Sequence, residues 1–187
     1  MTNVIIVHGT EGNPEGNWFP WLKQELEKLG CQVFVPRFPS PVGQNLASWL
    51  KELNAYEKHI GKDTILVGHS LGPAFILNVL ERLDHPVKAA FLVAGFTGRL
   101  GFQHFDDLNS TFADKEFDWD RIRKNCKQFY VLNSDNDPYV PLEKGKELAK
   151  RLKTKLTVVK GAGHMNQEFG YIKFDLLLEM VKRELVK

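Results

Sequence analysis

The feature that most constrains this sequence is the pentapeptide Gly68-His69-Ser70-Leu71-Gly72, which has an apolar stretch on each side. Residues 64–68 are mostly apolar or β-branched and predict a buried strand, and the apolar start of Leu71–Leu83 predicts a buried helix. A serine between two glycines where a strand meets a helix is the pattern of a nucleophile elbow, a sharp turn that pushes the serine hydroxyl outward. Chance alone produces this G-x-S-x-G pattern in about one chain in twenty of this length, so other parts of the sequence must support the interpretation.

Five other segments share the short, almost continuous apolar character of strands that are covered on both faces. Together with Thr64–Gly68, the predicted strands are Val4–His8, Gln32–Arg37, Ala89–Ala94, Phe129–Asn133 and Leu156–Lys160. Apolar residues at helical spacing lie between them and predict helices over 18–29, 46–56, 71–83, 142–152 and 171–186. This alternation predicts an α/β fold with a parallel sheet and helices on both faces.

The longest interruption of the alternation is 95–128, which is rich in phenylalanine and acidic residues and contains one short helical stretch, 119–125. Long connections within compact domains often form lids or binding loops. We expect a single domain over residues 1–187. Within it, 95–128 is either a small lid or cleft wall, or a surface excursion that its aromatic residues hold in place.

A serine hydroxyl becomes a good nucleophile only when a base removes its proton, and an acid must orient that base. In a fold with this elbow, the chain order is serine, then acid, then histidine. Asp137 follows the fifth predicted strand, and His164 follows the sixth. Because the carboxyl ends of parallel strands share one edge of the sheet, we expect Ser70, Asp137 and His164 to meet there. Asp135 is the rival acid, since one carboxylate of this Asp-Asn-Asp loop can serve the turn itself.

An acyl-transfer site also needs two N–H groups aimed at the developing oxyanion. Leu71, the residue after the serine, is expected to supply one of them, and Thr10, in the loop after the first strand, the other. Further candidates for the substrate cleft are His8, Gly9, His69 and Phe96, although the His69 side chain is expected to point away from the serine hydroxyl.

Composition and charge argue against several other classes of function. The net charge of +2 is too small for a typical nucleic-acid-binding protein. The sequence shows neither a signal peptide nor an apolar run long enough to cross a membrane. Two cysteines, Cys31 and Cys126, do not make a disulfide framework. We expect a cytoplasmic monomer that acts on a small-molecule acyl substrate, without a nucleic-acid or membrane partner and without a metal or cofactor.

Several motifs resemble those of the α/β-hydrolase superfamily: Val7-His8-Gly9, the pentapeptide 68–72, Asp137-Pro138 and Gly163-His164. The short chain and the stretch Asn17-Trp18-Phe19-Pro20-Trp21-Leu22 resemble its small serine hydrolase branch, typified by retinoblastoma-binding protein nine and the YdeN-like proteins. The resemblance implies three layers, about six mostly parallel strands in the order 2-1-3-4-5-6, and no large cap domain. It also implies a catalytic triad of Ser70, Asp137 and His164. It does not imply retinoblastoma binding, because the L-x-C-x-E motif is absent and Val33 stands where the glutamate belongs.

The expected function is therefore that of a serine hydrolase that cleaves a carboxylic ester, or less readily an amide, of a small acyl group. Two alternatives use the same residues differently. A hydrolase fold can serve as a binding module without turnover. An acyltransferase would share the acyl-enzyme step and pass the acyl group to an acceptor other than water.

Overall fold

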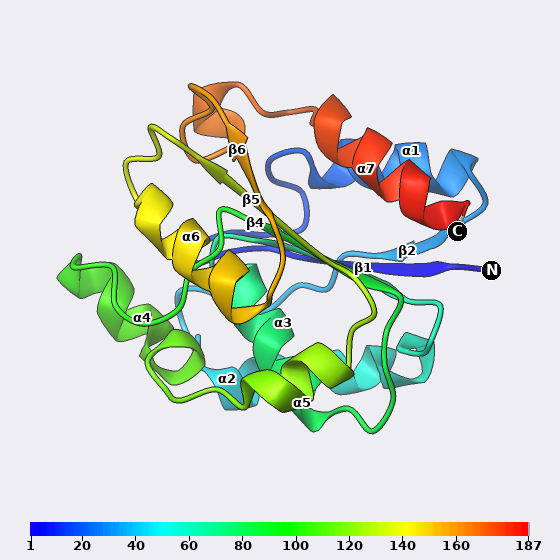
Figure 1. The fold of residues 1–187 in the computed structure, drawn as a ribbon, viewed down its shortest axis with the longest axis horizontal. Helices are drawn as coiled ribbons and strands as arrows, with labels where there is room; N and C mark the ends of the chain where they lie inside the picture. The colour runs from blue at the N-terminus through cyan, green and yellow to red at the C-terminus, as the bar shows by residue number, and fades with distance from the viewer. Residues whose placement is uncertain (187) are drawn as a thin grey trace.

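A six-stranded sheet forms the middle layer of the computed structural model, which describes residues 1–186 (Figure 1). Its strands are β1 (Asn3–Val7), β2 (Gln32–Phe34), β3 (Ile65–His69), β4 (Ala89–Val93), β5 (Phe129–Ser134) and β6 (Leu156–Val159). All neighbouring strands pair in parallel, and their order across the sheet is β2-β1-β3-β4-β5-β6. The predicted fold class and strand order are confirmed, and the carboxyl ends of all six strands lie at one edge.

Helices cover both faces of the sheet (Figure 1). One face carries α1 (Phe19–Lys28) and α7 (Asp175–Leu185), and the other carries α2 (Leu46–Leu53), α3 (Leu71–Arg82), α4 (Gln103–Ala113), α5 (Trp119–Lys124) and α6 (Leu142–Arg151). Side chains alternate along each strand, so Val4 and Ile6 of β1 pack with α1 and α7, whereas Ile5 and Val7 pack with α3. None of the helices within 1–186 has the length and apolar content needed to span a membrane.

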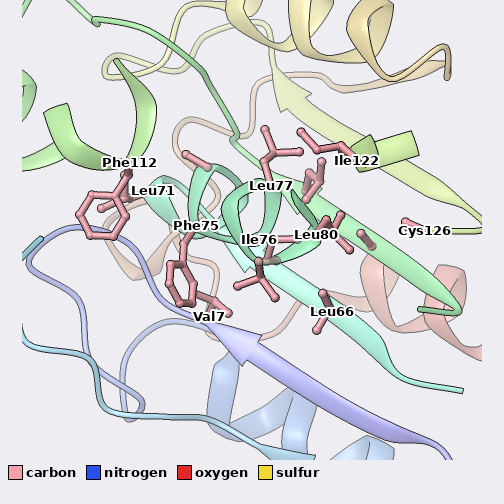
Figure 2. Packing of buried hydrophobic residues seen from close by; sticks show 14 of the residues in the cluster. Val7, Leu66, Leu71, Phe75, Ile76, Leu77, Leu80, Phe112, Ile122 and Cys126 are labelled. Carbon is pink, nitrogen blue, oxygen red and sulfur yellow. The ribbon is translucent and has the colours of Figure 1, made fainter. Parts of the chain in front are cut away.

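Helix α3 is the most deeply buried helix of the fold, since every residue from Leu71 to Leu80 is inaccessible or nearly so. Figure 2 shows its side chains between Val7 and Leu66 of the sheet and Phe112 and Ile122 of α4 and α5. A helix that is apolar on all sides can be stable only when it is enclosed in this way. The turn that leads into α3 is therefore held on a rigid base.

The structure corrects the prediction in several places. Strand β2 ends at Phe34 rather than Arg37, because β1 pairs with it over only three residues and a proline follows at position 36. Helix α7 begins at Asp175 rather than at position 171, and a short 3₁₀ turn, Gln167–Phe169, precedes it. The segment 95–128 contains the complete helix α4 in addition to the predicted short helix.

Helix α4 was not predicted because its buried positions include the polar residues Asp106 and Asn109 as well as Phe112 and Ala113. The carboxylate of Asp106 accepts hydrogen bonds from the backbone N–H groups of Leu100 (2.6 Å) and Gly101 (3.0 Å), which compensates its burial. A helix that buries polar side chains lacks the apolar periodicity on which the sequence prediction depends.

Glycine at position 72 is required by the close contact between α3 and β1. A Cβ atom at this position would lie 2.5 Å from the backbone oxygen of Val7, a distance at which the strand or the helix must move. We expect Gly72→Ala to lower the free energy of unfolding by about 1–3 kcal/mol in denaturant titrations. Gly61→Ala is the matched control, because no atom lies within 4 Å of its added Cβ, and it should stay within about 0.5 kcal/mol of the wild type. Equal stability of the two variants would contradict the packing argument.

Candidate active site

Ser70 occupies the sharp turn between β3 and α3. Its φ of +59° and ψ of −105° lie in a region that residues with a side chain rarely adopt, and its N–H donates to the backbone oxygen of Val93 at 2.9 Å. Gly68 and Gly72 do not themselves have positive φ angles. Their role is to allow close approach, since a Cβ on Gly68 would lie 2.7 Å from the backbone of Gly72 and Pro73. The strain of the turn is concentrated on the serine.

The loop after β1 lies directly against this turn. A Cβ on Gly9 would come within 2.7 Å of the Ser70 Cβ, so only glycine allows the two loops to approach this closely. The next residue, Thr10, and the first residue of α3, Leu71, both have backbone N–H groups without an acceptor anywhere in residues 1–186. The Leu71 N–H also stands at the positive end of the α3 dipole. The two predicted oxyanion donors are thus available for an outside acceptor.

His164 pairs with Asp137. The Nδ1 atom of His164 lies 2.7 Å from Oδ2 of Asp137, and the carboxylate is completely enclosed. The other oxygen, Oδ1, accepts the backbone N–H groups of Tyr139 (2.9 Å) and Val140 (3.0 Å). Because a carboxylate can only accept, Nδ1 of His164 carries the proton and Nε2 is left as the basic nitrogen.

The loops that carry these two residues are joined at four successive positions. Asp135 Oδ1 accepts the N–H of Gly161 (2.7 Å), Ser134 Oγ that of Ala162 (3.1 Å), and Asn136 Oδ1 that of Gly163 (2.8 Å). The fourth contact is the pair of Asp137 and His164. Asp135 therefore serves the loop backbone, and of the two candidate acids Asp137 is the one that reaches the histidine.

Two buried ring N–H groups hold the backbone on the far side of His164. His69 Nε2 lies 2.8 Å from the His164 carbonyl oxygen, and Trp18 Nε1 donates to the Met165 carbonyl at 2.9 Å. Burial, with a smaller contribution from the His164 ring, lowers the pKa of His69 from 6.5 to about 3. His69 is therefore neutral at pH 7, and its single ring proton sits on Nε2, because the carbonyl can only accept.

This buried neutral histidine should make the protein sensitive to acid. Since the pKa of His69 is about 3 in the folded chain and near 6.5 in the unfolded one, only the unfolded chain takes up a proton there between these pH values. This proton uptake favours the unfolded chain, so the free energy of unfolding has its full value above about pH 6.5 and falls as the pH drops toward 3. We expect His69→Gln, whose amide can still donate to the carbonyl, to show a shallower fall of the unfolding free energy over this range. Parallel curves for the two proteins would contradict the assignment.

A pocket of about 180 Å³ opens above Ser70 and His164, both of which line it. Its other walls come from segments far apart in the sequence. They include Thr10 after β1, Leu100, Phe105 and Asn109 from 95–128, and Tyr139 and Val140 after β5. The pocket thus joins the partly exposed serine, the histidine and one candidate oxyanion loop in a single small space.

The four further cleft candidates do not line this pocket, which corrects that expectation. His8 is fully buried, and its ring nitrogens contact the Gly9 carbonyl (2.8 Å) and the Phe38 N–H (3.1 Å). Phe96 belongs to the core around α3. His69 contacts the His164 carbonyl, and Gly9 packs against Ser70. Within residues 1–186, no group of three or more His, Cys, Asp or Glu side chains is arranged to hold a metal ion.

The chain is similar to known proteins over nearly its whole length. A family model described as "Serine hydrolase" matches residues 4–183. The YdeN protein of Bacillus subtilis is 32% identical to this chain over 188 residues. The serine hydrolase RBBP9 of Rattus norvegicus is 29% identical over 187 residues, and both matches cover at least 96% of this chain and of the relative. The crystal structure of the ydeN gene product superposes with a TM-score of 0.93 at 30% identity over 100% of both chains. Est1E of Butyrivibrio proteoclasticus, solved with bound ferulic acid, shares the fold (TM-score 0.76, 17% identity, 100% of this chain and 90% of that chain).

Proposed function

The chain belongs to the serine hydrolase family, and on that premise we propose that it cleaves a carboxylic ester of a small acyl group through an acyl-enzyme on Ser70. An amide of the same acids is the less reactive substrate. One observation carries the proposal. A serine held at a positive φ shares a small pocket with a histidine whose Nδ1 is fixed by a fully enclosed carboxylate 2.7 Å away.

In the first half of the proposed reaction, the Ser70 hydroxyl attacks the acyl carbonyl carbon and His164 Nε2 takes its proton. The negative charge that develops on the carbonyl oxygen is stabilised by the N–H groups of Leu71 and Thr10. Asp137 keeps the imidazole in the tautomer that can accept, and it stabilises the imidazolium that forms. The tetrahedral intermediate then collapses, and the His164 imidazolium gives its proton to the departing alcohol oxygen.

In the second half, a water molecule replaces the alcohol. His164 Nε2 takes a proton from this water as the water attacks the acyl carbon, and the same two N–H groups bind the second oxyanion. Collapse of this intermediate breaks the bond to Ser70 Oγ, which recovers its proton from the histidine. A carboxylic acid leaves, and the enzyme returns to its starting state by means of its own side chains and water alone.

The size of the pocket favours short acyl groups. Its volume of about 180 Å³ is below the range of about 300–1,000 Å³ that is usual for drug-sized ligands. Leu100 and Phe105 form an apolar part of the wall, and both come from 95–128. We propose that this segment is the wall of the acyl cleft.

A series of p-nitrophenyl esters tests the proposal. We expect kcat/KM to be highest for acyl chains of about two to four carbons and to fall steeply beyond about eight, because longer chains exceed the pocket. The matched p-nitroanilides should react more slowly, since an amide has the poorer leaving group. An enzyme that turned over none of the esters, or that preferred the longest, would overturn the proposed substrate class.

The monomeric state, the cytoplasmic location and the small-molecule partner stay predictions that come from the sequence alone. Sedimentation equilibrium checks the first of these, and a mass of 21.4 kDa is expected. A dimer would contradict the predicted monomer and would mean that part of its surface is covered in solution.

A further inference from the structure

Asn109 is a buried polar residue of α4 that lines the pocket of Ser70 and His164. Only 4% of the residue is exposed. Its Oδ1 atom accepts hydrogen bonds from the Thr10 hydroxyl (2.5 Å) and from Nε2 of Gln44 (3.2 Å). The Asn109 amide is therefore held between the loop after β1 and the residues that lead into α2.

Backbone groups at both ends of this network fix its direction. The Glu11 N–H donates to Ser40 Oγ (2.6 Å), so the Ser40 hydroxyl directs its own proton to Gln44 Oε1 (2.6 Å). The opposite end of Gln44 faces the Leu108 carbonyl at 3.1 Å, which can only accept, so that end must be the NH₂ group. The same NH₂ group faces Asn109, and the atom of Asn109 that meets it must be the oxygen.

The amide nitrogen of Asn109 consequently points away from the network. No atom in the described part of the chain accepts a hydrogen bond from Nδ2. Nδ2 is not sealed in the interior, because the one fully enclosed side-chain polar atom without a partner in residues 1–186 is Asn133 Oδ1. A buried donor costs stability unless something accepts a hydrogen bond from it, and Asn109 lines the pocket of Ser70 and His164, through which an outside acceptor can reach it.

The charges around the pocket indicate what kind of acceptor fits. Glu11 and Glu168 line it, and none of its lining residues is a lysine or an arginine. Glu168 also accepts the hydroxyl of Tyr139 (3.0 Å), and this hydrogen bond raises the pKa of the tyrosine, which stays neutral. Glu11 also contacts His104, whose Nε2 lies 2.8 Å from its Oε1. An anionic acyl group would still face the Glu168 carboxylate in a pocket that no lysine or arginine lines, so the acceptor is a neutral oxygen.

We propose that Asn109 is a specificity-determining residue whose Nδ2 donates a hydrogen bond to a second, neutral oxygen carried by the acyl group. This inference rests on the proposed function and narrows its substrate class to short acyl groups with a hydroxyl, alkoxy or keto oxygen. The scissile carbonyl already has the N–H groups of Leu71 and Thr10. Asn109 lies on the wall made by 95–128, together with Leu100 and Phe105, and so it serves the acyl chain.

The test compares p-nitrophenyl methoxyacetate with p-nitrophenyl butyrate, whose acyl groups differ only by an ether oxygen in place of a methylene. The kcat/KM ratio of the two esters is divided by the ratio of their hydrolysis rates without enzyme. Asn109→Leu removes the donor, and Asn109→Asp removes it while keeping the acceptor for Thr10 and Gln44. We expect both variants to lower the corrected ratio by about 3- to 10-fold, the range for one neutral hydrogen bond. Ser110→Ala, an exposed change on the same helix, should leave the ratio unchanged.

An equal loss of kcat/KM on both esters would overturn the inference, because it would assign Asn109 to the scissile carbonyl or to loop support. A binding experiment with unreactive amides distinguishes this result from a failure of the proposed function. The NMR signal of the Asn109 side-chain NH₂ is assigned by its loss in Asn109→Asp. In the Ser70→Ala protein, methoxyacetamide should shift this signal more than butyramide does. Equal shifts, or none, would overturn the inference whether or not the wild type turns over esters.

Discussion

A Ser70→Ala variant is expected to lose about 10⁶-fold in kcat on short-chain esters, the scale of loss seen when a triad that acts as a unit loses its nucleophile. The methyl group cannot form an acyl-enzyme, and the His164 base then has no hydroxyl to activate. The remaining rate should come from the oxyanion donors and from binding, which alone give about 10³–10⁴-fold over water. Stopped-flow and steady-state assays with p-nitrophenyl acetate measure the wild-type kcat and the remaining rate of the variant.

The variant should also stay folded, because alanine at the same positive φ keeps the backbone strain and removes only a partly exposed hydroxyl. Its denaturation midpoint is expected to match that of the wild type. Ser110→Ala again serves as the matched control and should keep its activity within about twofold. Turnover by a folded Ser70→Ala protein at more than about 1% of the wild-type rate would show that another residue performs the reaction.

An Asp137→Asn variant is expected to lose about 10⁴-fold in kcat with little change in KM, the size of loss that follows when a triad histidine is held in the wrong tautomer. Asparagine fits the enclosed space, and its oxygen can still accept the N–H groups of Tyr139 and Val140. Its NH₂ group then faces His164 Nδ1, which must become the acceptor. The proton moves to Nε2, and the nitrogen that should receive the serine proton is blocked.

Asp135→Asn is the matched control for this substitution, because it makes the same chemical change two residues away. Asp135 contacts the Gly161 N–H at 2.7 Å, and an asparagine oxygen can accept that bond equally well. We expect less than about a tenfold loss in kcat for this variant. If Asp135→Asn proved the more damaging of the two, the assignment of the acid would be wrong.

The sequence predicts the sheet well because its four inner strands, β1, β3, β4 and β5, are largely buried and read as short, almost continuous apolar runs. Chain order and the shared edge of a parallel sheet then place Ser70, Asp137 and His164 in one region. The sequence favours Asp137 over its rival Asp135, and the structure supplies the reason, since the Asp135 carboxylate binds the Gly161 backbone whereas that of Asp137 contacts His164.

The walls of the pocket could not be predicted in the same way. Helix α4 buries Asp106 and Asn109, whose burial depends on partners distant in the chain, such as Thr10 and Gln44. The cleft role predicted for His8 failed for a different reason. A position near a strand end indicates the correct edge of the sheet, but His8 turns into the core and packs against Phe38 and Trp49.

The nucleophile is identified most directly by finding which residue carries the covalent adduct of a fluorophosphonate probe. The protein is labelled, digested and analysed by mass spectrometry. One adduct per chain is expected, located on Ser70, with no labelling of the Ser70→Ala protein. An adduct on any other residue, or equal labelling of a folded Ser70→Ala protein, would contradict this assignment.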